Sequence, residues 1–166
     1  MPSSTRSLTV TDVLAFWGAI LSSIAFGWNL YRDLLDRGKL TVSAQLRRVA
    51  MGRDGKLYTF KDGIPIEGAS EKLYVVVTVM NSGRRPVMFK GWGGKWHDGK
   101  SFNVVGVDLP KMLAEGTYHS ELTDEIVEQI DNVKELYVWD AAGKNWKVSR
   151  KGLKMLKEEA RRIKTS

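Results

Sequence analysis

Between Arg84 and Lys100 the chain interleaves cationic and aromatic side chains, a combination suited to binding anions and stacked rings. We call this set the basic–aromatic cluster, and it consists of Arg84, Arg85, Lys90, Trp92, Lys95, Trp96, His97 and Lys100. Three glycines between them, Gly91, Gly93 and Gly94, could expose backbone amides to an anion. The cluster therefore predicts contact with a nucleotide, a nucleic acid or anionic lipid headgroups. The alternative is a glycine-rich connection whose tryptophans fill the core and whose charges are merely solvated.

The two histidines are the next candidates for chemistry, and neither belongs to a catalytic motif. His97 precedes Asp98 in a predicted turn, where a polar pair is more common than a general base. His119 is expected to face solvent, because it alternates with Tyr118 and Ser120. The chain has no cysteine and no phosphate-binding, nucleophile-elbow or zinc-protease motif. We therefore expect no enzymatic activity, no metal site and no cofactor.

An apolar stretch at residues 13–30 carries no charged side chain, and the rest of the chain is organised around it. At about 1.5 Å per helical residue it spans about 27 Å, close to the thickness of a bilayer's hydrocarbon core. We expect a transmembrane helix with a juxtamembrane extension at residues 13–37, capped by Thr11 and preceded by an N-terminal tail at residues 1–12. The alternative is a buried core helix, because serine and asparagine side chains interrupt the apolar pattern.

Small residues recur at every fourth position of this predicted helix and form one stripe. The stripe consists of Ala15, Ala19, Ser23 and Gly27. Such stripes let two helix backbones approach closely in lipid, so we predict a homo-oligomer formed through this helix. The alternative is the general abundance of small residues in membrane helices.

Basic residues flank the apolar stretch unequally, which predicts its orientation. Only Arg6 precedes the stretch, whereas five basic residues follow it closely: Arg32, Arg37, Lys39, Arg47 and Arg48. We therefore expect a single-pass protein of the inner (plasma) membrane, with the N-terminus outside and the large C-terminal domain in the cytoplasm. A cleaved secretory or periplasmic form is the alternative, since Ser23-Ile24-Ala25 resembles a signal cleavage site.

After Gly38 the hydrophobic period changes from helical to two, which indicates strands. Turn signals, such as those at residues 53–56 and 97–100, divide residues 39–149 into seven or eight short strands. In the central strand, Lys72–Met80, three valines are predicted to be buried: Val75, Val77 and Val79. The predicted fold class is mainly β, with a β-sandwich domain following the single helix.

Residues 150–166 are predicted to form a basic amphipathic helix at the C-terminus. Its apolar stripe consists of Leu153, Leu156, Ala160 and Ile163. We expect the stripe to dock on the chain's own domain. A helix lying on an anionic membrane surface is the alternative.

Several turn residues in the predicted strand region carry a resemblance to known domains. They are Val75-x-Val77-x-Val79-x-Asn81-x-Gly83 with Pro86, and then Leu113-x-x-Gly116 before a strand. This pattern resembles bacterial immunoglobulin-like sandwich domains, although the cysteines of antibody-type domains are missing. The whole arrangement, over roughly residues 8–149, resembles uncharacterised small bacterial membrane proteins that have one N-terminal transmembrane helix and such a domain. The resemblance implies a fold and no defined activity.

The net charge of +7 falls entirely on the chain after residue 31, so the partners of the domain are expected to be anionic. With no catalytic motif, we predict a membrane-anchored, non-enzymatic binding or scaffold module whose cytoplasmic β-sandwich recognises a protein partner. The alternative is a ligand-responsive membrane effector. In that case the basic domain would sense an anionic ligand, such as a nucleotide or nucleic acid, and the helices would oligomerise to perturb the membrane.

Overall fold

The computed structural model describes residues 9–64, 69–104, 106 and 108–165. The chain divides into two compact units, residues 1–37 and 38–166. The first unit contains one helix, α1 (Val10–Leu35). Its segment Val10–Asp33 is long and apolar enough to cross a membrane.

The helix α1 begins three residues earlier than predicted, because Thr9 and not Thr11 is its N-cap. The Thr9 hydroxyl accepts a hydrogen bond from the Asp12 backbone N–H at 3.3 Å. In return, the Asp12 carboxylate accepts one from the Thr9 N–H at 3.0 Å. This reciprocal capping box satisfies amides that lack partners within the helix. At the other end, Arg32 and Asp36 form an i,i+4 ion pair at 3.7 Å.

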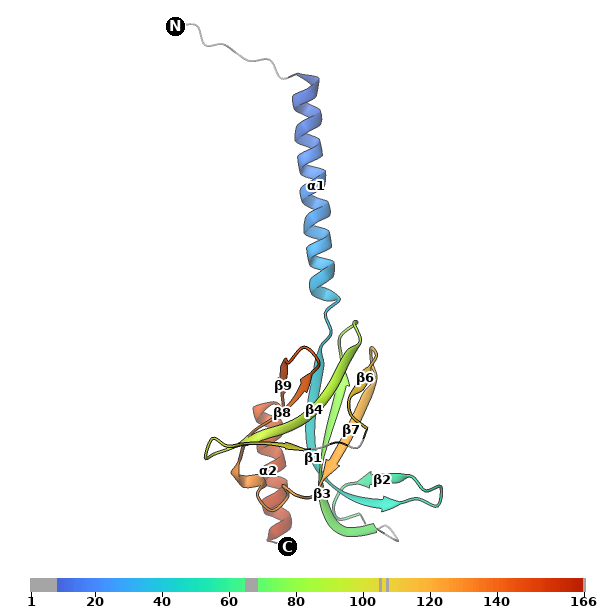
Figure 1. The fold of residues 1–166 in the computed structure, drawn as a ribbon, viewed down its shortest axis with the longest axis vertical. Helices are drawn as coiled ribbons and strands as arrows, with labels where there is room; N and C mark the ends of the chain where they lie inside the picture. The colour runs from blue at the N-terminus through green and yellow to red at the C-terminus, as the bar shows by residue number, and fades with distance from the viewer. Residues whose placement is uncertain (1–8, 65–68, 105, 107, 166) are drawn as a thin grey trace. The chain divides into compact units, whose positions relative to one another are not determined.

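The second unit is mainly β, as predicted, and its described residues also include a 3₁₀ turn and a C-terminal α-helix (Figure 1). Its strands are β1 (Leu40–Met51), β2 (Leu57–Phe60), β3 (Ala69–Asn81), β4 (Val87–Trp96), β5 (Ser101–Val104), β6 (Lys111–Leu113), β7 (Tyr118–Thr123), β8 (Val133–Asp140) and β9 (Asn145–Lys147). The helical elements are η1 (Ile130–Asn132) and α2 (Arg150–Lys164).

These strands form two antiparallel sheets that share one core. The first sheet has the order β2-β1-β3-β7, and the second has the order β5-β4-β8-β9, with β6 also pairing with β4. Alternation along each strand sends one set of side chains inward. The predicted burial of Val75, Val77 and Val79 is confirmed, at 0%, 1% and 0% exposure. They share the core with Phe89 and Trp92 of the second sheet.

Gly91, Gly93 and Gly94 lie inside β4 and not in the connection that the alternative interpretation supposed. A Cβ atom on Gly93 would collide with the Phe102 carbonyl oxygen of β5. A Cβ atom on Gly94 would collide with the Glu135 carbonyl oxygen of β8. Glycine is therefore required because the neighbouring strands approach β4 closely, and these residues do not form an anion-binding loop.

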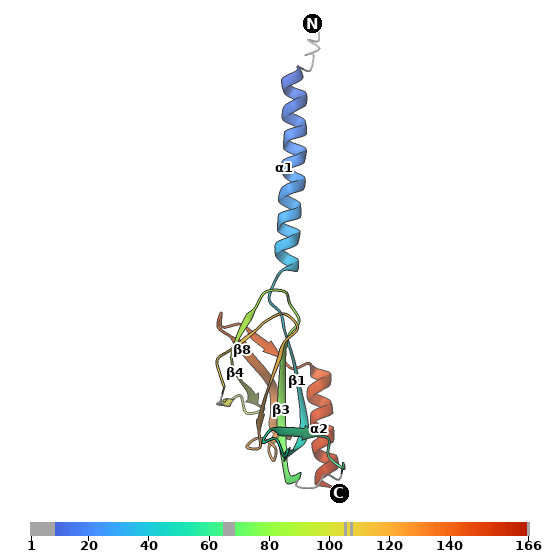
Figure 2. The same cartoon turned by 90° about the vertical axis from the view of Figure 1, so that its right-hand side faces the viewer.

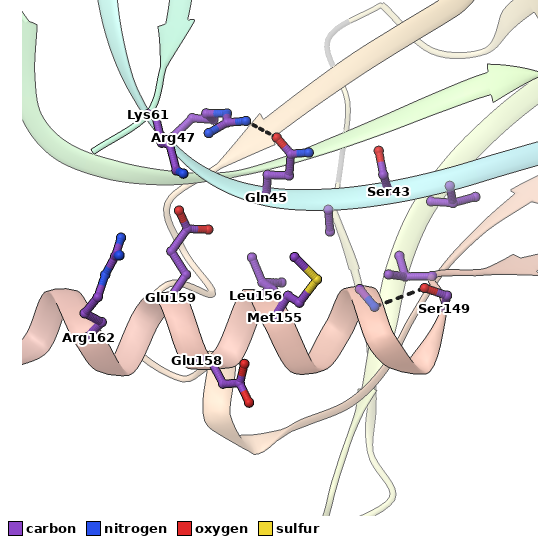
Figure 3. A pocket seen from close by; sticks show the side chains of 14 residues that line it. Ser43, Gln45, Arg47, Lys61, Ser149, Met155, Leu156, Glu158, Glu159 and Arg162 are labelled. Carbon is purple, nitrogen blue, oxygen red and sulfur yellow. Dashed lines mark hydrogen bonds between the residues drawn. The ribbon is translucent and has the colours of Figure 1, made fainter. Parts of the chain in front are cut away.

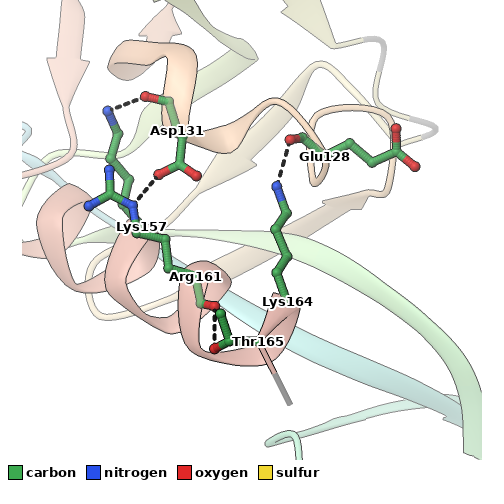
Figure 4. A network of polar contacts seen from close by, with 6 residues as sticks. All are labelled: Glu128, Asp131, Lys157, Arg161, Lys164 and Thr165. Carbon is green, nitrogen blue, oxygen red and sulfur yellow. Dashed lines mark hydrogen bonds and ion pairs between the residues drawn. The ribbon is translucent and has the colours of Figure 1, made fainter.

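The C-terminal helix docks on its own domain, as predicted. Figure 2 shows α2 lying beside β1, and its Leu156 and Ala160 are buried in the common core. Three of its cations are also anchored, as Figure 4 shows. Lys157 donates to the Asp131 carbonyl, Arg161 to the Asp131 carboxylate and Lys164 to the Glu128 carbonyl, each within 2.9 Å. The stripe that would enter a membrane surface is thus turned into the domain.

Candidate binding site

The basic–aromatic cluster does not form one site, because β4 separates its members. Arg84 and Arg85 precede β4, whereas His97 and Lys100 follow it. Ten strand residues at about 3.3 Å each place these two groups roughly 30 Å apart. The two turns lie at opposite ends of β4 in Figure 1. No small anionic ligand can touch both groups at once.

The aromatic members of the cluster face the core, which corrects the expectation of exposed rings. Trp92 is completely buried, and its indole N–H has no hydrogen-bond partner among the described residues. Trp96 is half-buried and packs on Phe102, with the ring centroids 4.4 Å apart. Both rings therefore fill space between the sheets, as the alternative interpretation stated.

A hollow of about 510 Å³ does lie at the β4–β5 turn and collects three members of the cluster. It is lined by Trp96, His97, Asp98, Lys100, Gln129 and Asn132. The Asp98 carboxylate accepts the Lys100 backbone N–H at 2.9 Å, and this bond lowers the pKa of Asp98. The Lys100 ammonium lies 3.3 Å from the same carboxylate. Lys100 and Asp98 thus pair with one another, and this local pairing accounts for the polar residues of the turn.

His119 points into the domain and not to solvent, so the prediction for β7 had the wrong phase. His119 is paired in register with the buried Val79, and Glu121 with the buried Val77. The His119 Nε2 and Glu121 Oε1 atoms lie 2.5 Å apart, and each side chain is only 11% exposed. Tyr118 is 70% exposed instead. The inward face of β7 could not be recognised from the sequence, because both faces of this strand carry polar side chains.

A second hollow of the domain lies elsewhere, between β1 and α2, and none of the sequence motifs considered above marks it (Figure 3). It has a volume of about 520 Å³, and we call it the β1–α2 groove. Strand β1 and the segment after β2 contribute Val42, Ser43, Ala44, Gln45, Arg47 and Lys61. The start and one face of α2 contribute Val148, Ser149, Gly152, Met155, Leu156, Glu158, Glu159 and Arg162.

The groove runs along an edge of β1 and not over one of its faces. Both inward residues such as Ala44 and outward residues such as Gln45 line it, which is possible only at the edge of a strand. On this side β2 pairs with β1 only from Arg48 to Met51. Within the described residues, β1 therefore has no strand partner on this edge from Leu40 to Arg47. Edge strands present a row of backbone donors and acceptors.

The walls of the groove differ along its length. Figure 3 shows Arg47, Lys61 and Arg162 at one end, together with Glu159. The floor near the middle is apolar, with Leu156 buried and Met155 58% exposed. An extended chain with an apolar side chain and an acidic side chain complements this arrangement. A strongly charged, compact ligand does not.

The small-residue stripe of α1 is present as a continuous exposed row. Ala15, Ala19, Ser23 and Gly27 are all exposed. The Ser23 hydroxyl donates to the Ala19 carbonyl at 2.8 Å, so its polar group is satisfied within its own helix. With its hydroxyl bonded within its own helix, Ser23 acts as a small residue and permits close packing of helices.

Comparisons with protein-family models, with curated proteins and with solved structures find no match to this chain. In the part of the chain that the structure describes, no three histidine or acidic side chains are grouped to hold a metal ion. A sequence signal for the groove did exist: Met155 interrupts the polar face of the predicted C-terminal helix.

Proposed function

We propose that this chain is a membrane-anchored, non-enzymatic binding module that recognises an extended segment of a partner protein. The segment enters the β1–α2 groove and adds as a strand to the edge of β1. The observation that supports this proposal is the stretch Leu40–Arg47, which has no strand partner on the groove side among the described residues. Strand addition uses such an edge for affinity and neighbouring pockets for specificity.

We further propose a membrane topology, an oligomeric state and a fold for the chain. The helix α1 crosses the inner membrane once with the N-terminus outside, because basic residues follow it. Its stripe Ala15, Ala19, Ser23 and Gly27 joins copies of the chain into a homo-oligomer. The domain is an immunoglobulin-like sandwich, supported by its two antiparallel sheets around one core. Anionic headgroups are further partners of the basic domain.

Peptide selection on the full-length protein tests this function directly. The protein is reconstituted in phosphatidylcholine nanodiscs and used to select from a library of displayed random peptides. Selected peptides should bind wild type, and Met155→Arg should weaken binding by about tenfold or more, because a longer charged side chain obstructs the groove. Met112→Arg is the matched control, since Met112 is similarly exposed, at 55%, and lies on β6 outside the groove.

Hydrogen exchange then locates the bound peptide. Strand addition should slow exchange of the backbone amides in residues 40–47 without altering β4 or β8. Protection that appears only in another part of the domain would contradict the groove as the site. Equal binding by the Met155→Arg and Met112→Arg variants would do the same.

A further inference from the structure

The outward face of the second sheet carries a group of side chains that the groove does not use. Inward residues of this sheet include Trp92 and Val138, which are paired in register. Their sequence neighbours must therefore point outward. The outward face, which we call the β4–β8 face, carries Ser101, Asn103, Gly91, Gly93, Lys95, Glu135, Tyr137, Trp139, Asn145 and Lys147. These ten positions include two aromatic rings and two amides, and the exposed Met88 and Met112 lie farther along the same side of the sheet, where β6 pairs with β4.

The Trp139 ring lies over the backbone of β4 at Gly91. A Cβ atom on Gly91 would come within 2.8 Å of the Trp139 Cε2 atom, so only glycine permits this position. The Tyr137 ring follows with its centroid 6.2 Å from that of Trp139. Both side chains are half-buried. Each ring thus rests on the sheet and keeps part of its surface open to solvent.

Lysines lie near the two rings in the pairing of β4, β8 and β9. Lys147 is paired in register with Tyr137 across β8 and β9, and its side chain is 57% exposed. Lys95 is exposed on β4, and Lys90 is the exposed extra residue where the pairing of β4 and β8 shifts register between Phe89 and Gly91.

Glu135 is the acidic member of the β4–β8 face. Its carboxylate accepts a hydrogen bond from the Lys147 ammonium at 2.8 Å, and this bond lowers the pKa of Glu135. Lys95 and Lys147 outnumber this carboxylate on the face, and the exposed Lys90 at its margin adds a third cation. Aromatic–glycine packing alone would explain the position of the Trp139 ring but not the lysines around it.

Stacking rings with ammonium groups beside them match the chemistry of single-stranded nucleic acid. Exposed bases stack on aromatic side chains, and lysines contact the phosphates between them. We propose that the β4–β8 face binds single-stranded nucleic acid, with bases on Tyr137 and Trp139 and phosphates at Lys90, Lys95 and Lys147. This site shares Lys90 and Lys95 with the basic–aromatic cluster, and its rings are the half-buried Tyr137 and Trp139 in place of the fully buried Trp92. It is independent of the peptide groove.

Binding of a defined oligonucleotide tests the site. Full-length protein in phosphatidylcholine nanodiscs is titrated into fluorescein-labelled oligothymidine of about 12 nucleotides, and anisotropy is recorded at several salt concentrations. Trp139→Leu should weaken binding roughly tenfold. Lys95→Gln and Lys147→Gln should each reduce the slope of log K against log salt by about 0.7, as expected for one lost phosphate contact.

Matched controls separate this face from general electrostatics. Tyr118→Leu removes an exposed ring from the first sheet, and Lys154→Gln removes an exposed cation from α2. Both controls should bind the oligonucleotide like wild type. The lysine variants retain the aromatic packing, so they report on the site even if Trp139→Leu is unfolded in a thermal melt.

Three results would overturn the proposal. One is the absence of oligothymidine binding by wild type at low salt. Another is an equal loss of affinity in the control and face variants, which would assign binding to net charge. The third is binding of a neutral glucan oligosaccharide in place of oligothymidine. If that binding were independent of salt and lost in Trp139→Leu, the face would be a carbohydrate site.

Discussion

Glu135 and Lys147 illustrate how single residues set the pH response of the domain. The hydrogen bond from Lys147, supported by the charges of Lys147, Lys95 and Lys134, lowers the pKa of Glu135 below its ordinary value of 4.5. A lowered pKa means that the pair stabilises the fold above about pH 4.5, and that this contribution is lost as the pH falls through the lowered value. The pair is partly exposed, so its contribution is below about 1 kcal/mol.

Replacing Glu135 should therefore have a pH-dependent effect. Glu135→Gln should lower the free energy of unfolding by up to about 1 kcal/mol at neutral pH, and the difference from wild type should shrink as the pH falls below the ordinary pKa of a glutamate. Denaturation of detergent-solubilised protein over this pH range measures it. Lys147→Gln should reproduce the same pH dependence. A constant difference at all pH values would show that Glu135 acts through packing.

His119 and Glu121 form the second residue-scale feature, because they satisfy one another at the margin of the core. His119→Leu leaves the Glu121 carboxylate without this partner and should cost about 1–3 kcal/mol of unfolding free energy. The double variant His119→Leu with Glu121→Leu should recover part of that loss. A double-mutant cycle in denaturant measures the coupling. Additive single effects would argue against an interacting pair.

At the scale of elements, α2 completes the core and forms one wall of the groove. Leu156 is 1% exposed, whereas the adjacent Met155 is 58% exposed. Leu156→Asp should place an unpaired charge in the core and release α2, at a cost of several kcal/mol by order of magnitude. Hydrogen exchange of residues 150–164 should then accelerate. Met155→Asp should leave exchange near wild type, and rapid exchange in both variants would show that the docking was marginal.

The small-residue stripe of α1 is the other element that invites a test. Ala19→Leu combined with Ser23→Leu should push neighbouring helices apart and reduce the oligomer in detergent, because packing provides much of the drive for association in lipid. Ile20→Leu with Ile24→Leu is the control, since these positions are already large. A monomeric wild-type protein, or a stripe variant that associates normally, would leave α1 as an anchor only.

The whole molecule joins an apolar helix to a basic domain, and this asymmetry predicts its topology. The net charge of +7 lies after residue 31, and basic residues follow the apolar stretch closely. A reporter fused after Ser166 should therefore be active in the cytoplasm, and its cytoplasmic activity in cells measures the orientation. Activity only outside would reverse the orientation and favour the secretory interpretation.

Features encoded by local periodicity were predictable from the sequence. The apolar stretch at residues 13–30 predicted α1, and the valines of Lys72–Met80 predicted a buried strand. The stripe of the C-terminal helix predicted its docking. In each case neighbouring residues carry the signal, because helix and strand periods repeat over short distances.

Only the tertiary structure decided which surfaces could bind. The Trp92 ring faces inward because the register of β4 pairs it with the buried Val138 of β8. The phase of β7 followed from pairing with β3, since its own sequence is polar on both faces. The groove joins Ser43 to Met155, and the β4–β8 face joins Gly91 to Trp139. Such contacts between distant residues depend on strand order and register, which a local hydrophobic pattern does not specify.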